Sequence, residues 1–374
     1  MKIQKAPQKK KDKKMILYLF RRPVQNTLKD VRRGEYPADF FYGLNRINKK
    51  FVVTTTDKVF KNKIVTGLDY LLIKFLSQYL KTGTSFFSVL YLTNQINKVN
   101  LTFVTVDTYG LPCALLKFIK IIKTPFIYNT IGLCDALVDS KSQLFKAVCK
   151  IILKTSDHIV SGASYFECKK LSSLLSIPIS KFSFIPFGID TVYFHPKKNK
   201  IENFVLIVGA DPKRDWDLYL KIIQLLPHIK FVIITNKEVF NNPPQNVRML
   251  YNLPIRLVRE YIWKSRLVLI LSRQNYHFAG QSTILRCMSC AKTVIFTKSY
   301  GTNEYSFVNS VNSILVPPTD HKAVVIAINQ VYQSQEILDS IGKKARNLII
   351  KKYNLNTYSK KLSNTIEKIL QVYK

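Results

Sequence analysis

Apolar and polar positions along the chain fall into two alternating patterns. One is a short, nearly continuous apolar run, which is typical of a strand buried on both faces of a parallel sheet. The other spreads its apolar residues at helical spacing. In the first half, the strand-like runs lie at 15–20, 51–56, 101–107, 125–130, 158–162 and 182–188. In the second half they lie at 204–210, 230–236, 247–251, 267–273, 293–299 and 313–318.

Helical patterns separate these runs, for example at 37–48, 217–226, 254–265 and 321–333. Strands that alternate with helices are typical of a sheet with helices on both faces. Two sets of about six such units predict an α/β protein with two Rossmann-like, doubly wound domains. Ligands of such sheets bind at the carboxyl ends of the strands, so we expect the site in a cleft between the two domains.

The same pattern divides the chain into four segments. Residues 1–14 are a basic arm that is too polar to fold by itself. Residues 15–196 and 197–355 are the two domains, joined at a polar, proline-containing stretch. Residues 356–374 have the pattern of an amphipathic helix with no later element to pair with, so we expect this helix to cross back to the first domain.

Length and composition support two domains and point to an acidic partner. The 374 residues are 47% hydrophobic, which is enough for two cores. The net charge is +35. Nucleic acid, anionic lipid and phosphorylated small molecules all suit such a charge. A compositional bias toward Lys, Asn and Ile would also raise it without any function.

Several sequence features bear on location and metal content. The run at 15–20 is too short for a signal-peptide core, and no apolar run of about 18 residues is free of Lys and Arg. The six cysteines are mostly far apart, which indicates reduced thiols, and the five histidines have no ligand spacing. Cys287 and Cys290 form a C-x-x-C, for which packed helix thiols are favoured over a zinc site. We therefore expect a cytoplasmic protein with no metal site.

The stretch "AGQSTILRCMSC" (279–290) has the pattern of a loop that enters a helix after the strand at 267–273. Backbone N–H groups of Gly280, Gln281, Ser282 and Thr283 would then face an anion, helped by the helix dipole. Gly280 permits close approach, and Ser282 or Thr283 would either cap the helix or donate to a phosphate oxygen. An ordinary capped helix is the alternative. A second basic loop beside it, "DPKRDW" (211–216), favours the anion site.

Four stretches resemble the GT-B glycosyltransferases, particularly family four. They are "IPFGIDTVYFHP" (185–196), "GADPKRDWDLYL" (209–220), "GQSTILRCMSCAKTVIFTKSYGTNEY" (280–305) and "VNSILVPPTD" (311–320). The likeness covers most of the second domain in order and spacing, and the first domain only by pattern. It implies an acceptor domain followed by a nucleotide-sugar domain. It also implies transfer of a sugar from a UDP- or GDP-linked donor, with retention of configuration, without a metal and with no cofactor besides this co-substrate.

The resemblance assigns roles to further residues. Lys213 and Arg214 would neutralise the donor diphosphate, although a solvated basic turn is the alternative. Glu304 and Tyr305 resemble an acidic turn that faces the cleft at the donor, although a surface turn is the alternative. The remaining expected positions are Gly188 and Asp190 in the hinge, and Gly34, Glu35, Asn129 and Thr130 along the acceptor side of the cleft.

The chain departs from the family at several of these places. Family members commonly carry two glutamates eight positions apart, where this chain has Phe278 and Arg286. The second glutamate accepts hydrogen bonds from the ribose, and arginine has no acceptor. His277 is a candidate for a polar contact with the sugar, or an exposed loop residue. Ala210 replaces a further arginine of many relatives.

Arg286 lies about one turn into the helix, where the dipole disfavours a cation. We expect an anion to compensate it, since an arginine in helical position leans toward the N-terminus. The candidates are the donor diphosphate, Glu304 and an acidic sugar. Glu304 or direct donor contact is favoured over simple exposure to solvent.

A glycosyltransferase acting on a lipid-linked glycan, a protein or a small molecule is the favoured function. Because both family glutamates are missing, a catalytically impaired partner subunit is the first alternative. A nucleic-acid-binding protein is the less favoured one, because the sequence has no recognition helix or stacking motif. The basic arm and the Lys-dotted apolar segments 71–92 and 115–123 also suggest peripheral contact with an anionic membrane, unless those two segments are buried core helices.

Overall fold

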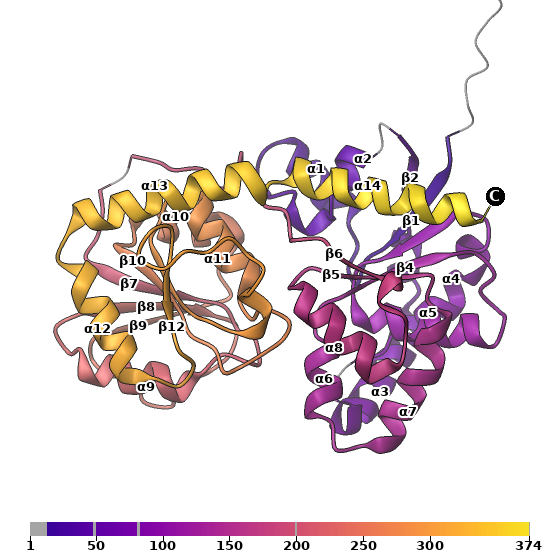
Figure 1. The fold of residues 1–374 in the computed structure, drawn as a ribbon, viewed down its shortest axis with the longest axis horizontal. Coiled ribbons are helices and arrows are strands. Elements are labelled where there is room, and N and C mark those ends of the chain that lie inside the picture. Colours follow the sequence, from indigo (N-terminus) through magenta and orange to yellow (C-terminus); the bar gives the residue numbers. More distant parts are fainter. Residues whose placement is uncertain (1–12, 48–49, 81–82, 199, 374) are drawn as a thin grey trace, which may run out of the picture.

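The computed structural model describes residues 13–47, 50–80, 83–198 and 200–373. Most of the expected basic arm, residues 1–12, lies outside the described residues. The described chain forms two α/β lobes that stand side by side (Figure 1). Each lobe is built on one six-stranded parallel sheet. The predicted class, two Rossmann-like doubly wound domains, is confirmed, and a strand occurs within each of the twelve expected runs.

The first sheet has the strand order β2-β1-β3-β4-β5-β6. Its strands are β1 (Met15–Leu19), β2 (Val52–Thr55), β3 (Leu101–Val104), β4 (Phe126–Thr130), β5 (His158–Ser161) and β6 (Phe182–Phe184). The α-helices of this lobe are α1 (Gln25–Arg32), α2 (Leu44–Ile47), α3 (Lys63–Leu80), α4 (Phe86–Ile96), α5 (Asp107–Phe118), α6 (Leu133–Asp139), α7 (Gln143–Ile152) and α8 (Tyr165–Leu175). Short 3₁₀ turns are η1 (Asp39–Phe41), η2 (Asp57–Lys61), η3 (Leu153–Thr155) and η4 (Ile179–Lys181).

The second sheet has the order β12-β11-β10-β7-β8-β9. Its strands are β7 (Phe204–Val208), β8 (Lys230–Thr235), β9 (Val247–Tyr251), β10 (Leu267–Ile270), β11 (Val294–Thr297) and β12 (Ile314–Val316). Around it lie α9 (Trp216–Leu225), α10 (Ile255–Lys264), α11 (Gln281–Ser289), α12 (His321–Tyr332), α13 (Gln335–Lys352) and the turn η5 (Tyr300–Thr302). The strand order reverses between β7 and β10, which is where such sheets bind ligands.

The prediction of a single helix at 37–48 is wrong in part. The structure breaks it into η1 and α2, because Tyr42 and Gly43 between them have φ angles of 49° and 71°. A Cβ atom on Gly43 would lie 2.3 Å from the Ser359 hydroxyl oxygen, so only glycine permits the approach of the C-terminal helix here.

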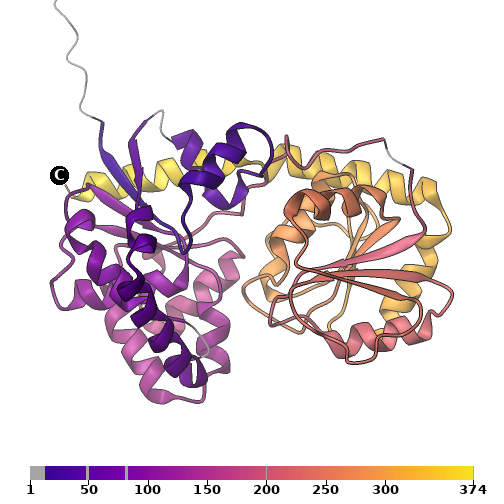
Figure 2. The same ribbon diagram turned by 180° about the vertical axis from the view of Figure 1, so that it is seen from behind.

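That last helix, α14 (Leu355–Val372), follows α13 and lies along the first lobe, as both views show (Figures 1 and 2). Asn354 caps it by accepting hydrogen bonds from Asn356 and Thr357. The helix is fixed to the first lobe by an ion pair between Lys50 and Glu367 and by a hydrogen bond from Arg46 to Asn356. One continuous stretch of chain thus joins the two lobes a second time.

Candidate active site

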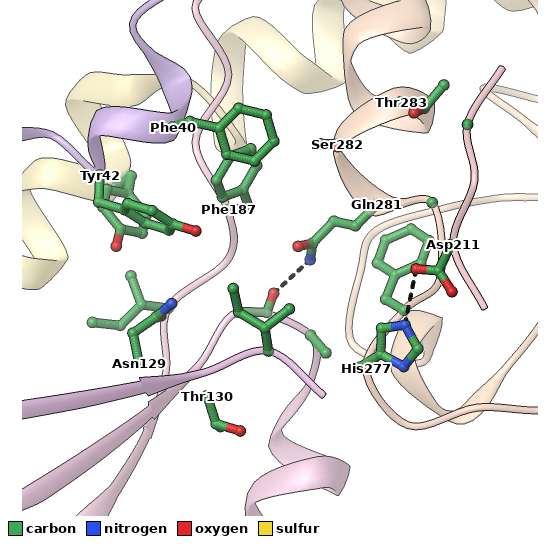
Figure 3. Close-up of a pocket in the computed structure, with 18 of the residues that line it drawn as sticks. Phe40, Tyr42, Asn129, Thr130, Phe187, Asp211, His277, Gln281, Ser282 and Thr283 are labelled. Carbon is green, nitrogen blue, oxygen red and sulfur yellow. Dashed lines mark hydrogen bonds and ion pairs between the residues drawn. The ribbon is translucent and has the colours of Figure 1, made fainter. Parts of the chain in front are cut away.

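A cleft of about 330 Å³ lies between the lobes, at the carboxyl ends of strands from both sheets (Figure 3). From the first lobe it is lined by the ends of β4 and β5 and by the chain after β6. From the second lobe it is lined by the loop after β7 and by the segment from β10 into α11. The sequence-predicted residues that line it are Asn129, Thr130, Arg214, His277, Gly280, Gln281, Ser282 and Thr283.

Arg214 is buried at the base of this cleft. Its Nη2 donates to the carbonyl oxygen of Val208 at 2.9 Å, at the end of β7. Its Nη1 is buried but has no hydrogen-bond partner among the described residues. Cβ atoms at Gly209 and Gly280 would come within 2.9 Å and 2.8 Å of the guanidinium, so both glycines make room for it. An unpaired cationic donor in a cleft is costly unless a ligand accepts from it.

Helix α11 begins directly beside this arginine. Its N-cap is Gly280, with φ of 84°, and no side chain within the described ranges caps the helix. The expectation that Ser282 or Thr283 caps it is therefore wrong, because both lie inside the first turn. The first N–H groups of α11 and the Arg214 guanidinium form one electropositive corner, which suits an anion with several oxygens.

His277 bridges the two lobes instead of offering a free ring nitrogen. Its Nδ1 lies 2.6 Å from Asp135 of α6, and its Nε2 lies 3.1 Å from Asp211 of the second lobe. Burial by itself would lower the pKa of His277, but hydrogen bonds to both carboxylates and their charges raise it to about 10. The imidazole is therefore protonated at neutral pH and donates from both nitrogens. His277 also lines the cleft, and its contact with a sugar stays a prediction.

Lys213 and Arg214 were expected together on the diphosphate, and the structure separates them. The Lys213 ammonium lies 2.6 Å from Asp139 and 3.7 Å from Asp135, both on the first lobe. It does not line the cleft. Of the two cations, Arg214 alone faces the ligand side, because adjacent side chains of the loop point in different directions.

The "GTNEY" turn also joins the lobes. The Glu304 carboxylate accepts from the backbone N–H of Phe166 in the first turn of α8. The Tyr305 hydroxyl donates to the carbonyl oxygen of Gly162, which also accepts from Gln281 at 2.6 Å. Neither Glu304 nor Tyr305 lines the cleft. Gln281 does, and its amide spans the cleft to Gly162 (Figure 3).

Arg286 contradicts the expected pairing with Glu304. Its Nε and Nη2 donate to the two carboxylate oxygens of Asp39 at 2.9 and 2.8 Å. Both partners are buried, and the rings of Phe40 and Phe194 lie 4.7 and 4.9 Å from the guanidinium. Burial would lower the pKa of Arg286, but the Asp39 charge raises it. The compensating anion thus comes from the other lobe, 247 positions away in sequence.

On the acceptor side, the cleft wall is formed by residues a few positions after the predicted ones. Gly34 and Glu35 are exposed and do not line the cleft; the wall is formed by Phe40 and Tyr42 instead. Polar atoms come from β4, where the buried Thr130 hydroxyl has no partner among the described residues. Sequence reasoning missed the two aromatic residues because they lie in the run that was assigned to one helix.

The predicted hinge residues lie where the chain passes between the lobes. A Cβ atom on Gly188 would lie 2.6 Å from Cβ of Tyr358 in α14, so glycine permits close packing there. Asp190 accepts from the backbone of Ala38 at 2.9 Å and from the N–H groups of Val192 and Tyr193. The linker is thus held against both the first lobe and the C-terminal helix.

Cysteines and possible metal ligands do not add to the site. All six cysteines are buried free thiols. No cluster of three or more His, Cys, Asp or Glu with the geometry of a metal site occurs in the part of the chain that the structure describes.

Comparison with known proteins places the fold among the GT-B glycosyltransferases. No family profile and no curated protein sequence matches the chain. HepE from Anabaena, solved with UDP-glucose, is similar with a TM-score of 0.68 and 14% identity, over 95% of this chain and 100% of that one. Sucrose-phosphate synthase from Thermosynechococcus elongatus gives 0.73 and 13%, over 96% and 100%. A glycosyltransferase from Rickettsia africae gives 0.61 and 16%, over 96% and 99%. The fold is therefore the GT-B fold.

Proposed function

We propose that this protein is a glycosyltransferase that takes a sugar from a nucleotide diphosphate donor. The observation that carries the proposal is the electropositive corner made by Arg214 and the N-terminus of α11. A diphosphate supplies the acceptor oxygens that the Arg214 Nη1 lacks, and the same groups stabilise the charge that develops when the sugar–phosphate bond breaks. HepE, which has the same fold, was solved with UDP-glucose, and this supports a UDP-linked donor.

In this proposal the first lobe supplies the acceptor. The cleft wall opposite the corner carries Thr130 with an unpartnered hydroxyl and the aromatic side chains of Phe40 and Tyr42. A hydroxylated acceptor that lies on these rings would face the donor sugar. Retention of configuration and independence of metal follow from the family resemblance and remain part of the proposal. Peripheral attachment to an anionic membrane also belongs to it.

A non-catalytic GT-B subunit is the second candidate, and it too has a specific observation in its favour. The side chains of His277 and Arg286, which replace or neighbour the family's polar groups, are engaged between the lobes. Such a protein would bind a nucleotide or a nucleotide sugar but would not cleave the bond between the sugar and the diphosphate.

The two functions are separated by one experiment with the purified full chain. Binding of UDP and GDP is measured by calorimetry, and release of the nucleotide from UDP- and GDP-sugars is followed with and without candidate acceptors. We expect binding of one nucleotide diphosphate and slow release from the matching sugar. Binding without any release across the donor panel would support the subunit, and no binding of either nucleotide would overturn both.

A further inference from the structure

Helix α3 carries an apolar stripe on its solvent side. Ile64, Leu68 and Leu71 recur at spacings of four and three, and their exposed fractions are 76%, 41% and 62%. This spacing places them on one face of the helix. An amphipathic helix of a globular domain normally turns such a stripe toward the core, whereas α3 presents it to the outside.

Helix α7 repeats the feature beside it. Leu144 is 76% exposed, and Val148 and Ile151 are also exposed, while Phe145, Cys149 and Ile152 form its buried face. The exposed stripe is therefore additional to the face that packs on the lobe. Both helices lie in the outer part of the first lobe, away from α14, which packs on the opposite face of the sheet (Figure 1).

An apolar trough of about 650 Å³ lies between these two helices. Leu72 and Leu76 of α3 form one wall, Leu144 and Val148 of α7 form the other, and residues of α4 and α5 line the rest. Thr84 and Ser142 contribute the polar side chains among its described lining residues. The exposed stripes thus continue into a groove that water hydrates poorly.

Lysines are frequent along α7, beside this face. The segment 140–156 contains four lysines and no acidic residue. Lys141 and Lys150 are exposed, and neither forms an ion pair with any described residue. Apolar side chains flanked by unpaired lysines are the features by which a helix lies in the interface of an anionic bilayer. In the described part of the chain, no helix is long and apolar enough to cross a membrane.

Helix α5 connects the groove with the cleft. Ile131 lines the cleft, and its backbone N–H donates a hydrogen bond to the carboxylate of Asp107. Asp107 is the first residue of α5, and Leu111, one turn later, lines the groove. A molecule held at the bilayer by this face would thus reach the acceptor wall around a single helix N-terminus.

We propose that the face formed by α3 and α7 docks on an anionic bilayer, with acyl chains against the trough and lysines at the headgroups. This docking proposal also extends the proposed function. If the protein is a glycosyltransferase, its acceptor is a membrane-anchored amphiphile whose polar end enters the cleft. The segment 71–92 contributes as two helices, α3 and α4, rather than as one apolar span.

The test uses the full chain and sedimentation with vesicles of phosphatidylcholine, alone or with about one third phosphatidylserine. The variants are Leu71→Glu and Leu144→Glu, and the matched control is Ile326→Glu, an exposed position (56%) on α12 of the other lobe. We expect binding to the anionic vesicles at low salt, weak binding to neutral ones, and at least about a tenfold loss in both variants but not in the control. All three variants should keep the wild-type melting temperature because the positions are exposed.

A second pair of variants tests the charge. Lys141→Gln with Lys150→Gln should lower anionic-vesicle binding by about tenfold or more, whereas Lys343→Gln with Lys344→Gln on α13 should not. Equal binding of the face variants and their controls would overturn the proposal, as would equal binding to neutral and anionic vesicles. A dimer in light scattering that Leu71→Glu dissociates would also overturn it, because a second copy of the chain would then cover the face. Vesicle binding is measured without nucleotide and nucleotide binding without vesicles, so either proposal can fail alone.

Discussion

Two buried arginines, one beside helix α11 and one within it, have different roles in this structure. Arg214 stands at the N-terminus of α11, makes one bond to a backbone carbonyl and keeps Nη1 unpaired. Arg286 lies within α11, and Asp39 of the opposite lobe neutralises it through two hydrogen bonds. The first arrangement is suited to a ligand and the second to holding the lobes together. The presence of a carboxylate partner, rather than burial, distinguishes them.

The comparison is tested most strongly by removing that carboxylate. Asp39→Ala leaves the Arg286 charge enclosed between two aromatic rings, and removing one member of a buried ion pair costs about 3–5 kcal/mol. Denaturant unfolding should show this loss. Asp217→Ala, in an exposed ion pair with Arg273, is the control and should cost about 0–1 kcal/mol. If the two variants unfold alike, the Asp39–Arg286 pair does not hold the lobes.

Arg214 should instead affect the ligand. Arg214→Ala should weaken UDP binding by about 1.5–3 kcal/mol, as expected for a charge-assisted hydrogen bond, which calorimetry can measure. Lys213→Ala is the neighbouring control, and because Lys213 points to Asp139 it should leave UDP affinity within about 0.5 kcal/mol of wild type. Equal losses of UDP affinity in the two variants would show that Lys213 and Arg214 both contact the diphosphate.

The His277 bridge also holds the lobes together, and its contribution to stability depends on pH. The ring pKa is raised from 6.5 to about 10, so its contribution is complete below about pH 6.5 and is lost as the pH rises through about 10. His277→Gln should lower stability by about 1–2 kcal/mol at pH 7, since the ring is partly exposed.

The melting temperatures of wild type and His277→Gln should converge as the pH is raised from 7 to 10. A difference that stays constant over this range would mean that the ring is neutral throughout, and that the bridge is made by an ordinary hydrogen bond.

The sequence was sufficient for the fold because the information is local. Continuous apolar runs mark all twelve strands, and the helices at α9, α10 and α12 follow from their periodicity. The N-terminus of α11 could also be predicted, because Gly280 directly precedes a helical pattern in the segment that follows β10. The run at 37–48 failed because the left-handed Tyr42 and Gly43 are imposed by packing against α14, which lies more than 300 positions later.

Partners across the cleft could not be predicted in the same way. Asp39 for Arg286, Asp135 for His277 and Asp139 for Lys213 all lie on the first lobe, where the sequence showed no motif. Each cation was therefore assigned to the ligand or to its own lobe. Pairing between lobes depends on their relative placement, and no periodicity in the sequence encodes it.

The smallest expected effect concerns Glu304, the partner first expected for Arg286. Its carboxylate accepts a hydrogen bond from the backbone N–H of Phe166 in the first turn of α8. At this end of a helix, the dipole interacts favourably with a negative charge. Glu304→Gln keeps an acceptor oxygen but removes the charge, so it should cost about 0.3–1 kcal/mol in denaturant unfolding. Because Arg286 is bonded to Asp39 instead, the losses from Glu304→Gln and Arg286→Met should add within about 0.5 kcal/mol. A larger coupling energy in this double-mutant cycle would show that the two side chains interact after all, and would reopen the assignment of Arg286 to Asp39 alone.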